Sequence, residues 1–190
     1  MKIALITNSR IPSLTANSIQ AMKVAQALMQ LGHDARMFAP AETEPVSQQL
    51  LITHYGVRLI PPLELLPSIS GLKRLDFIVH AQRAAQKFGA ELIYTWLPQS
   101  AALALWMKYP VVLEMHADVT GLMGAWWLRQ FWNAKGKKTM TVTTSALRNV
   151  LERSTKLKLE NEAVIVAPNG VELERYASLP SPSEARRQLN

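Results

Sequence analysis

The chain contains no cysteine, which excludes disulfide bonds, a thiol nucleophile and any cysteine-based metal site. It also lacks a long apolar run: the densest one, residues 101–107, is far shorter than the roughly 20 residues of a membrane-spanning helix. At the N-terminus a single lysine precedes four apolar residues, too few for the core of a signal peptide. These absences predict a soluble or peripheral protein and fit a cytoplasmic location.

Glycine is missing from the first loop, residues 8–17. The pattern G-x-G-x-x-G, which lets a backbone approach a pyrophosphate, is therefore absent, and so is a P-loop. We expect no NAD-type or ATP-type cofactor. This loop and the helix start after it carry small polar side chains that suit the recognition of hydroxyl or phosphate groups: Thr15, Asn17, Ser18 and Gln20. The alternative is that these side chains serve only the loop and the helix cap.

Basic residues exceed acidic ones, and the excess is local. The chain has a net charge of +7, while residues 119–158 hold eight basic residues and a single acidic one. The basic residues of this zone are Arg129, Lys135, Lys137, Lys138, Arg148, Arg153, Lys156 and Lys158. Such a zone predicts an anionic partner, namely a phospholipid surface, a phosphate-bearing substrate or a nucleic acid, or else solvated helix faces without a partner.

Strand-like and helix-like segments alternate about seven times. Residues 2–7 form a continuous apolar run, as expected of a strand buried on both faces. The next segment has apolar residues at three- and four-residue steps from Ile19 to Leu31, with Ser18 as the expected N-cap. This alternation predicts an α/β fold: a doubly wound, Rossmann-like parallel sheet with helices on both faces.

The remaining elements follow from the same periodicities. The expected strands are 33–39, 57–60, 91–95, 111–115, 138–144 and 162–167, and the expected helices are 46–55, 72–88, 100–108, 122–134 and 145–153. Residues 62–71 fit neither class, because they are too interrupted by proline for a helix and too apolar for an idle loop. Residues 1–176 are the expected domain, and residues 177–190 a linker and the first helix of another.

His116 directly follows the buried strand 111–115. A histidine in this position can hydrogen-bond a polar substrate or transfer protons near neutral pH. Glu114 alternates to the same side of the strand, and Asp118 is close in sequence. The alternative is a capping aspartate beside a structural histidine. The other histidines show no ligand spacing, so no metal site is expected.

The helix expected at 122–134 combines four large aromatic residues with basic neighbours. The aromatic residues are Trp126, Trp127, Phe131 and Trp132. This composition is typical of a core helix with a wet outer face, and also of an interfacial membrane helix. It occurs in single-stranded nucleic-acid binding too, but no RNA-binding motif accompanies it, so no nucleic acid is expected as a partner.

Six segments together resemble the N-terminal half of a GT-B glycosyltransferase of the retaining family 4 type. They are KIALI (2–6), SIQAMK (18–23), LGHD (31–34), HAD (116–118), TTSAL (143–147) and VAPNGVE (166–172). The resemblance covers nearly the whole chain. It implies a two-domain enzyme whose N-terminal domain binds the acceptor and whose C-terminal domain, absent here, binds most of a nucleotide-sugar.

The resemblance also implies roles for particular residues. His116 would be the catalytic residue that contacts the donor sugar, and the loop from Thr15 to Ser18 would face the donor phosphates and the acceptor. Asn169 and Gly170 would shape the hinge edge of the cleft. The full set of expected substrate-binding residues is Thr15, Asn17, Ser18, Gln20, Trp96, Asp118, Asn169 and Gly170.

The expected function is therefore transfer of a sugar, with retention, from a nucleotide-sugar to an acceptor. The nucleotide-sugar is a co-substrate, so no resident cofactor is expected. A lipid-linked or cell-envelope glycan is the expected acceptor, and an anionic membrane surface on the cytoplasmic side is a further expected partner. This chain alone is expected to be inactive. The alternative is a free-standing α/β module that binds a phosphorylated or sugar ligand without catalysis.

Overall fold

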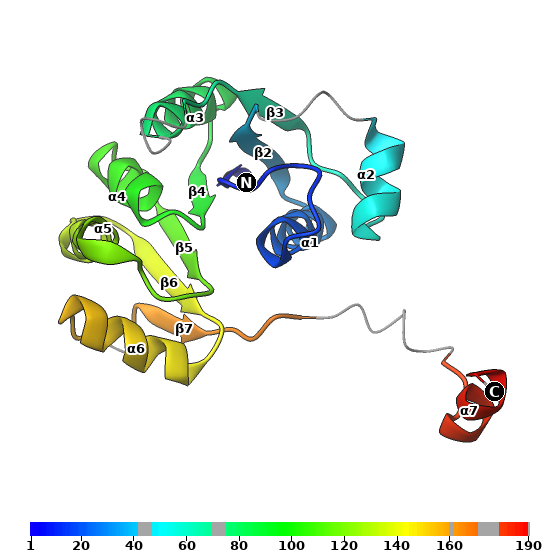
Figure 1. The fold of residues 1–190 in the computed structure, drawn as a ribbon. Coiled ribbons are helices and arrows are strands. Elements are labelled where there is room, and N and C mark those ends of the chain that lie inside the picture. Colours follow the sequence, from blue (N-terminus) through cyan, green and yellow to red (C-terminus); the bar gives the residue numbers. More distant parts are fainter. Residues whose placement is uncertain (42–46, 70–74, 160–161, 171–178, 190) are drawn as a thin grey trace.

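A computed structural model describes residues 1–41, 47–69, 75–159, 162–170 and 179–189. Within them, seven parallel strands form one sheet in the order β3-β2-β1-β4-β5-β6-β7 (Figure 1). The strands are β1 (Lys2–Ile6), β2 (Asp34–Pro40), β3 (Leu63–Leu66), β4 (Leu92–Thr95), β5 (Val111–Met115), β6 (Lys138–Val142) and β7 (Val164–Val166). The helices are α1 (Ala16–Gln30), α2 (Gln48–Tyr55), α3 (Leu75–Phe88), α4 (Pro98–Trp106), α5 (Gly121–Asn133), α6 (Ser145–Thr155) and α7 (Pro182–Leu189).

The strand order reverses between β1 and β4, and this reversal distributes the helices over both faces. Right-handed crossovers place α1 and α2 on one face and α3 to α6 on the other (Figure 1). Each face has its own core. One contains Leu5, Met22 and Met37, and the other contains Ile6 and Phe131. The predicted doubly wound α/β sheet is confirmed.

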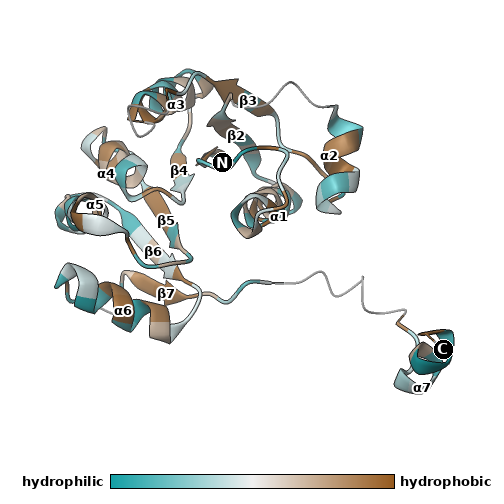
Figure 2. Ribbon diagram, viewed as in Figure 1, coloured by the Kyte–Doolittle hydropathy of each residue, from teal (hydrophilic) through white to brown (hydrophobic). Residues whose placement is uncertain are grey.

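The central strands are apolar because helices cover them. Residues 3–6 of β1 are all buried, as predicted for a strand between two layers. Figure 2 shows most of the sheet in brown, whereas α6 alternates brown and teal along its length. No helix within the described residues is long and apolar enough to span a membrane.

The third strand was predicted in the wrong place. The expected strand 57–60 is not one, and β3 lies within the segment 62–71 that fitted neither class. Arg58 and Leu59 donate their amides to the side-chain oxygen of Gln26 (the second at 3.2 Å) rather than to a strand. The carbonyl of Pro62 accepts from the amide of Met37 at 2.9 Å and starts the pairing of β3 with β2.

Two helices begin earlier than their polar residues suggested. Thr15, not Ser18, is the N-cap of α1, and Ser18 lies fully buried inside the helix. Thr144, not Ser145, is the N-cap of α6, where its hydroxyl accepts from the amide of Leu147 at 3.0 Å. In each case several capping residue types stand in a row, and only the backbone geometry selects one of them.

The C-terminal segment agrees with its predicted helix. α7 forms there, and none of its residues is buried. The predicted domain boundary at residue 176 and the end of the segment 166–172 lie outside the described residues. The division into 1–176 and 177–190 therefore stays a prediction.

One side of α5 packs into the core, as in the interpretation of residues 122–134 as a core helix with a wet outer face. Leu128 and Phe131 are completely buried, whereas Leu122 is 88% exposed. The two leucines of the same helix thus differ almost as much in burial as two residues can.

This contrast gives a stability prediction. We expect Leu128→Ala to lower the free energy of unfolding by about 2–5 kcal/mol, because it opens a cavity in the core. The matched control Leu122→Ala removes the same atoms from the surface and should change it by about 0.5 kcal/mol or less. Urea unfolding measures both, and equal effects would contradict the burial of this face.

Candidate functional site

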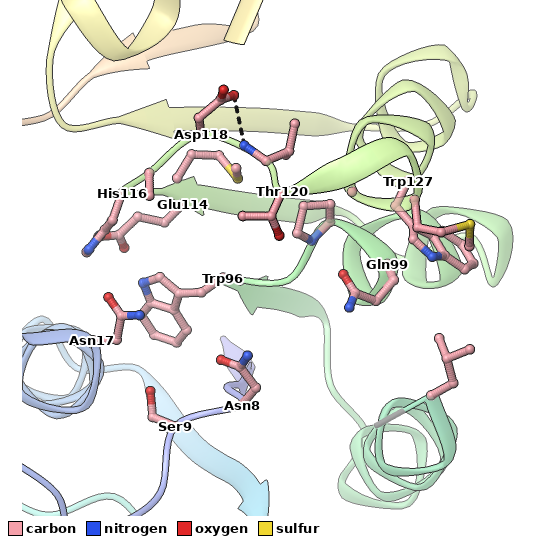
Figure 3. A pocket seen from close by; sticks show the side chains of 17 residues that line it. Asn8, Ser9, Asn17, Trp96, Gln99, Glu114, His116, Asp118, Thr120 and Trp127 are labelled. Carbon is pink, nitrogen blue, oxygen red and sulfur yellow. Dashed lines mark hydrogen bonds and ion pairs between the residues drawn. The ribbon is translucent and has the colours of Figure 1, made fainter. Parts of the chain in front are cut away.

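A pocket of about 550 Å³ lies at the carboxyl edge of the sheet, where β1, β4 and β5 end (Figure 3). The ends of β1 and β4 are tied together, because the hydroxyl of Thr95 donates to the carbonyl of Ile6 at 2.8 Å. The lining residues are Asn8, Ser9, Asn17, Leu75, Trp96, Pro98, Gln99, residues 114–120, Met123, Gly124 and Trp127. This is the edge at which open α/β sheets bind ligands.

Glu114 and His116 are the charged centre of the pocket. Both leave β5 on the same side, and His116 Nε2 forms a short hydrogen bond with Glu114 Oε1. The other carboxylate oxygen accepts from the hydroxyl of Tyr94 on β4. The side-chain amide of Gln20 on α1 approaches Oε1 at 3.5 Å. Three side chains, from β4, α1 and the segment after β5, therefore meet around the carboxylate of Glu114.

The carboxylate is ionised in this environment. Burial alone would raise the pKa of Glu114, but the hydrogen bonds from His116 and Tyr94 and the charge of His116 hold that pKa below its ordinary value of 4.5. Burial, together with the charge of Glu114, raises the pKa of Tyr94, so its phenol keeps its proton. Tyr94 is thus a permanent donor to Glu114.

Trp96 and Asn17, two of the residues predicted to bind substrate, line the pocket. Trp96 lies beside Tyr94, with ring centroids 5.2 Å apart. Its indole nitrogen is buried and has no hydrogen-bond partner among the described residues. In Figure 3 Asn17 and Trp96 lie next to each other below His116 and Glu114.

Other predicted site residues lie elsewhere or have structural partners. Thr15, Ser18 and Gln20 do not line the pocket among the described residues. The Ser18 hydroxyl makes a hydrogen bond of 2.5 Å with that of Tyr55 on α2, and Thr15 accepts from Ser13 at 3.1 Å. Thr15 and Ser18 therefore serve the first loop and the packing of α1, whereas Gln20 reaches Glu114.

Asp118 lines the pocket but also ties its wall to α6. Its Oδ1 accepts from the amide of Val119 at 2.8 Å and from the hydroxyl of Ser154 at 2.7 Å. Asn169 and Gly170 are exposed beyond β7 and do not line the pocket. Their predicted place at a hinge is untested within the described residues.

Several lining residues were not predicted. Asn8 and Ser9 lie in the loop after β1, Gln99 lies in the first turn of α4, and Tyr94 was overlooked although it supports Glu114. The signal for Tyr94 was weak: it shares one side of its strand with Trp96, but only the strand order shows that β4 is next to β5.

The pocket has a polar end and an apolar end. Trp127 lies across the pocket from Glu114 and His116 (Figure 3) and marks the apolar end, and Leu75, Pro98 and Met123 are further apolar lining residues. The pocket continues into an apolar patch, which we define as the exposed side chains of Trp106, Leu122, Met123 and Trp126. The ring of Trp127 connects pocket and patch, with ring centroids 4.6 Å from Trp126 and 6.0 Å from Trp106.

The described residues contain no group of three or more His, Asp or Glu side chains that could hold a metal ion. The chemistry that this pocket can offer through its own residues is hydrogen bonding to hydroxyl groups and proton exchange through His116.

Comparison with known proteins places this site in a family context. The family model described as Glycosyltransferase Family 4 matches residues 18–175. Comparison with curated protein sequences found no match.

Solved structures share the fold. HepE from Anabaena is 18% identical to this chain, with a TM-score of 0.62. The match covers 100% of this chain and 50% of HepE. Sucrose-phosphate synthase from Thermosynechococcus elongatus is 18% identical, with a TM-score of 0.64. The match covers 100% of this chain and 52% of the synthase. MurG from Acinetobacter baumannii is 14% identical, with a TM-score of 0.52. The match covers 77% of this chain and 42% of MurG. The chain thus spans about half the length of the first structures that it matches.

The ionised state of Glu114 predicts a pH-dependent contribution to stability. Because its pKa is lowered on folding, the carboxylate stabilises the fold above pH 4.5, and this contribution is lost as the pH falls through the folded-state pKa. We expect Glu114→Gln to be less stable than the wild type at about pH 7, with a gap that narrows at about pH 3. Urea unfolding at both pH values tests this, and a constant gap would contradict it.

Proposed function

The chain belongs to Glycosyltransferase Family 4, and we propose that it is the acceptor-binding N-terminal domain of an enzyme that transfers a sugar from a nucleotide-sugar to an acceptor. The observation that carries this proposal is the pocket in which His116 is held against the ionised Glu114 at the carboxyl edge of the sheet. The pocket is rich in groups that bind hydroxyls, among them Asn8, Asn17 and Gln99.

A nucleotide-sugar is the proposed donor. The structure of the similar HepE contains UDP and glucose, and that of UDP-GlcNAc 2-epimerase from Methanocaldococcus jannaschii contains UDP-GlcNAc and UDP. In this proposal a second domain of the full-length enzyme binds most of the nucleotide, so this chain alone is inactive. The nucleotide-sugar is consumed as a substrate, and no resident cofactor is needed.

The proposed reaction breaks the bond between the sugar's anomeric carbon and the phosphate oxygen, and forms one to an acceptor oxygen on the same face. The acceptor hydroxyl loses its proton, and the leaving phosphate takes up one proton, so the reaction balances. His116 orients a hydroxyl group of the reacting sugar, while the buried Glu114 fixes the imidazole. Positioning of this kind lowers the barrier because the reacting groups are aligned before the reaction.

His116 gives the decisive variant. In the full-length enzyme we expect His116→Ala to lower kcat/KM for sugar transfer by roughly 10²-fold or more, because an aligned polar contact near the reaction centre is lost. Transfer is measured as nucleotide release with a panel of nucleotide-sugars.

The matched control is His80→Ala, which removes an exposed histidine from α3. It should leave transfer unchanged. Unchanged turnover in His116→Ala would contradict the proposed site.

We propose further that the acceptor is lipid-linked and that the apolar patch meets the inner face of the membrane. Support comes from the position of the patch beside the apolar end of the pocket. α4 carries no charged residue, and neither does α5 from Gly121 to Leu128. Exposed tryptophans on helix segments without charged residues suit the boundary between headgroups and acyl chains.

The basic zone supports this contact less than its charge suggested. Arg129, Lys138 and Arg148 donate to backbone carbonyls of this domain, so their charges serve helix and loop ends. Lys135 and Lys137 are exposed beyond the end of α5 and flank Gly136, which lies against the side chain of Leu105 next to Trp106 of the patch. In this proposal these two lysines are the basic residues placed to meet an anionic headgroup.

Vesicle pelleting tests the membrane contact. We expect the chain to pellet with phosphatidylcholine vesicles and Leu122→Glu to abolish this, because a charge in the patch opposes insertion. The control Leu31→Glu changes a leucine that is 72% exposed and outside the patch, and it should pellet like the wild type.

Vesicles with added anionic lipid show how much the basic zone contributes. Negligible pelleting with both kinds of vesicle would remove the proposed membrane contact.

A further inference from the structure

Glu114 has an unusual position for an ionised side chain, since it is only 7% exposed. Tyr94 donates to one of its oxygens, and His116 and Gln20 contact the other. A buried carboxylate is costly unless donors satisfy it, so the arrangement of these donors constrains where each proton lies.

The proton positions follow from the donor inventory. An ionised carboxylate only accepts hydrogen bonds, so the nitrogen that faces it, Nε2 of His116, must carry a proton. In the neutral imidazole the other ring nitrogen, Nδ1, then has a free lone pair. Nδ1 has no hydrogen-bond partner among the described residues, and His116 lines the pocket.

We infer that Glu114 and Tyr94 are positioning residues that fix the tautomer of His116, so that the neutral imidazole presents Nδ1 as an acceptor to a ligand hydroxyl. The inference rests on the proposed function, because a sugar or glycan supplies that hydroxyl. It also states a selectivity: a neutral His116 with this tautomer accepts from a hydroxyl and has no proton at Nδ1 to give to a phosphate or carboxylate.

Tyr94 has its own part in this arrangement. Its phenol keeps its proton and donates it to Glu114, and an oxygen of residue 114 that faces Tyr94 preserves this hydrogen bond. With a carboxylate both atoms are oxygens, and His116 also meets an acceptor. With an amide at position 114, Tyr94 would claim the single oxygen, and the NH₂ group would face Nε2 of His116.

Two variants therefore predict an inverted and a restored tautomer. In Glu114→Gln the amide NH₂ donates to Nε2, which must then accept, so the proton moves to Nδ1. In the double variant Tyr94→Phe with Glu114→Gln, nothing holds the amide oxygen near position 94. That oxygen can turn to His116, and the proton returns to Nε2. A role for Glu114 in packing alone predicts neither change.

The tautomer is measured by two-bond ¹H–¹⁵N correlation spectra of the ¹⁵N-labelled chain at a pH above the titration of histidine. We expect the wild type to carry the proton on Nε2 of His116, Glu114→Gln to carry it on Nδ1, and the double variant to carry it on Nε2 again. His80, exposed on α3, serves as an internal reference with averaged signals. A wild-type proton on Nδ1, or the same tautomer in all three proteins, would overturn the inference.

A second measurement links the tautomer to the ligand. In the full-length enzyme we expect Glu114→Gln to lower kcat/KM for transfer by about tenfold, as for one misdirected hydrogen bond, and the double variant to recover part of this loss. An inverted tautomer with unchanged transfer would overturn the ligand-facing role of Nδ1. The spectra need neither donor nor acceptor, so an enzyme without transferase activity would overturn the proposed function and leave the tautomer result standing.

Discussion

The reversal of strand order between β1 and β4 is the constraint on which the rest of the structure depends. Because right-handed crossovers run outward from this point in both directions, helices cover opposite faces in the two halves of the sheet. The carboxyl ends of β1, β4 and β5 therefore lie together at one edge of the sheet. The pocket occupies that edge, so the fold itself places Asn8, Trp96 and His116 within one cavity.

Within this frame the buried carboxylate of Glu114 organises the polar end of the pocket. It draws a phenol from β4, an imidazole from the end of β5 and an amide from α1. An ionised group at this depth is stable only with such donors, and the same donors limit how the imidazole can be protonated. Fold stability and the proposed recognition of a hydroxyl therefore depend on the same hydrogen bonds.

The two ends of the pocket suggest how one domain of a family-4 glycosyltransferase could hold an amphipathic acceptor. Hydroxyl-binding groups lie beside Glu114 and His116, while Met123 and Trp127 lead out to the apolar patch. In the proposed function, this arrangement separates recognition of a sugar from contact with an apolar chain. Three of the eight basic residues of the zone, Arg129, Lys138 and Arg148, serve backbone carbonyls, so net charge alone overstated the part of the zone in binding a surface.

The sequence by itself determined the α/β class, nearly every helix and strand, and the place of His116 at a strand end, because apolar periodicity and parallel-sheet geometry are local properties. Only the tertiary structure decided the partners. Gln26 keeps residues 58 and 59 out of the sheet, Tyr55 buries Ser18, and the adjacency of β4 and β5 brings Tyr94 to Glu114. Each of these contacts joins residues at least 20 positions apart, and which residues meet depends on strand order and helix packing rather than on local pattern.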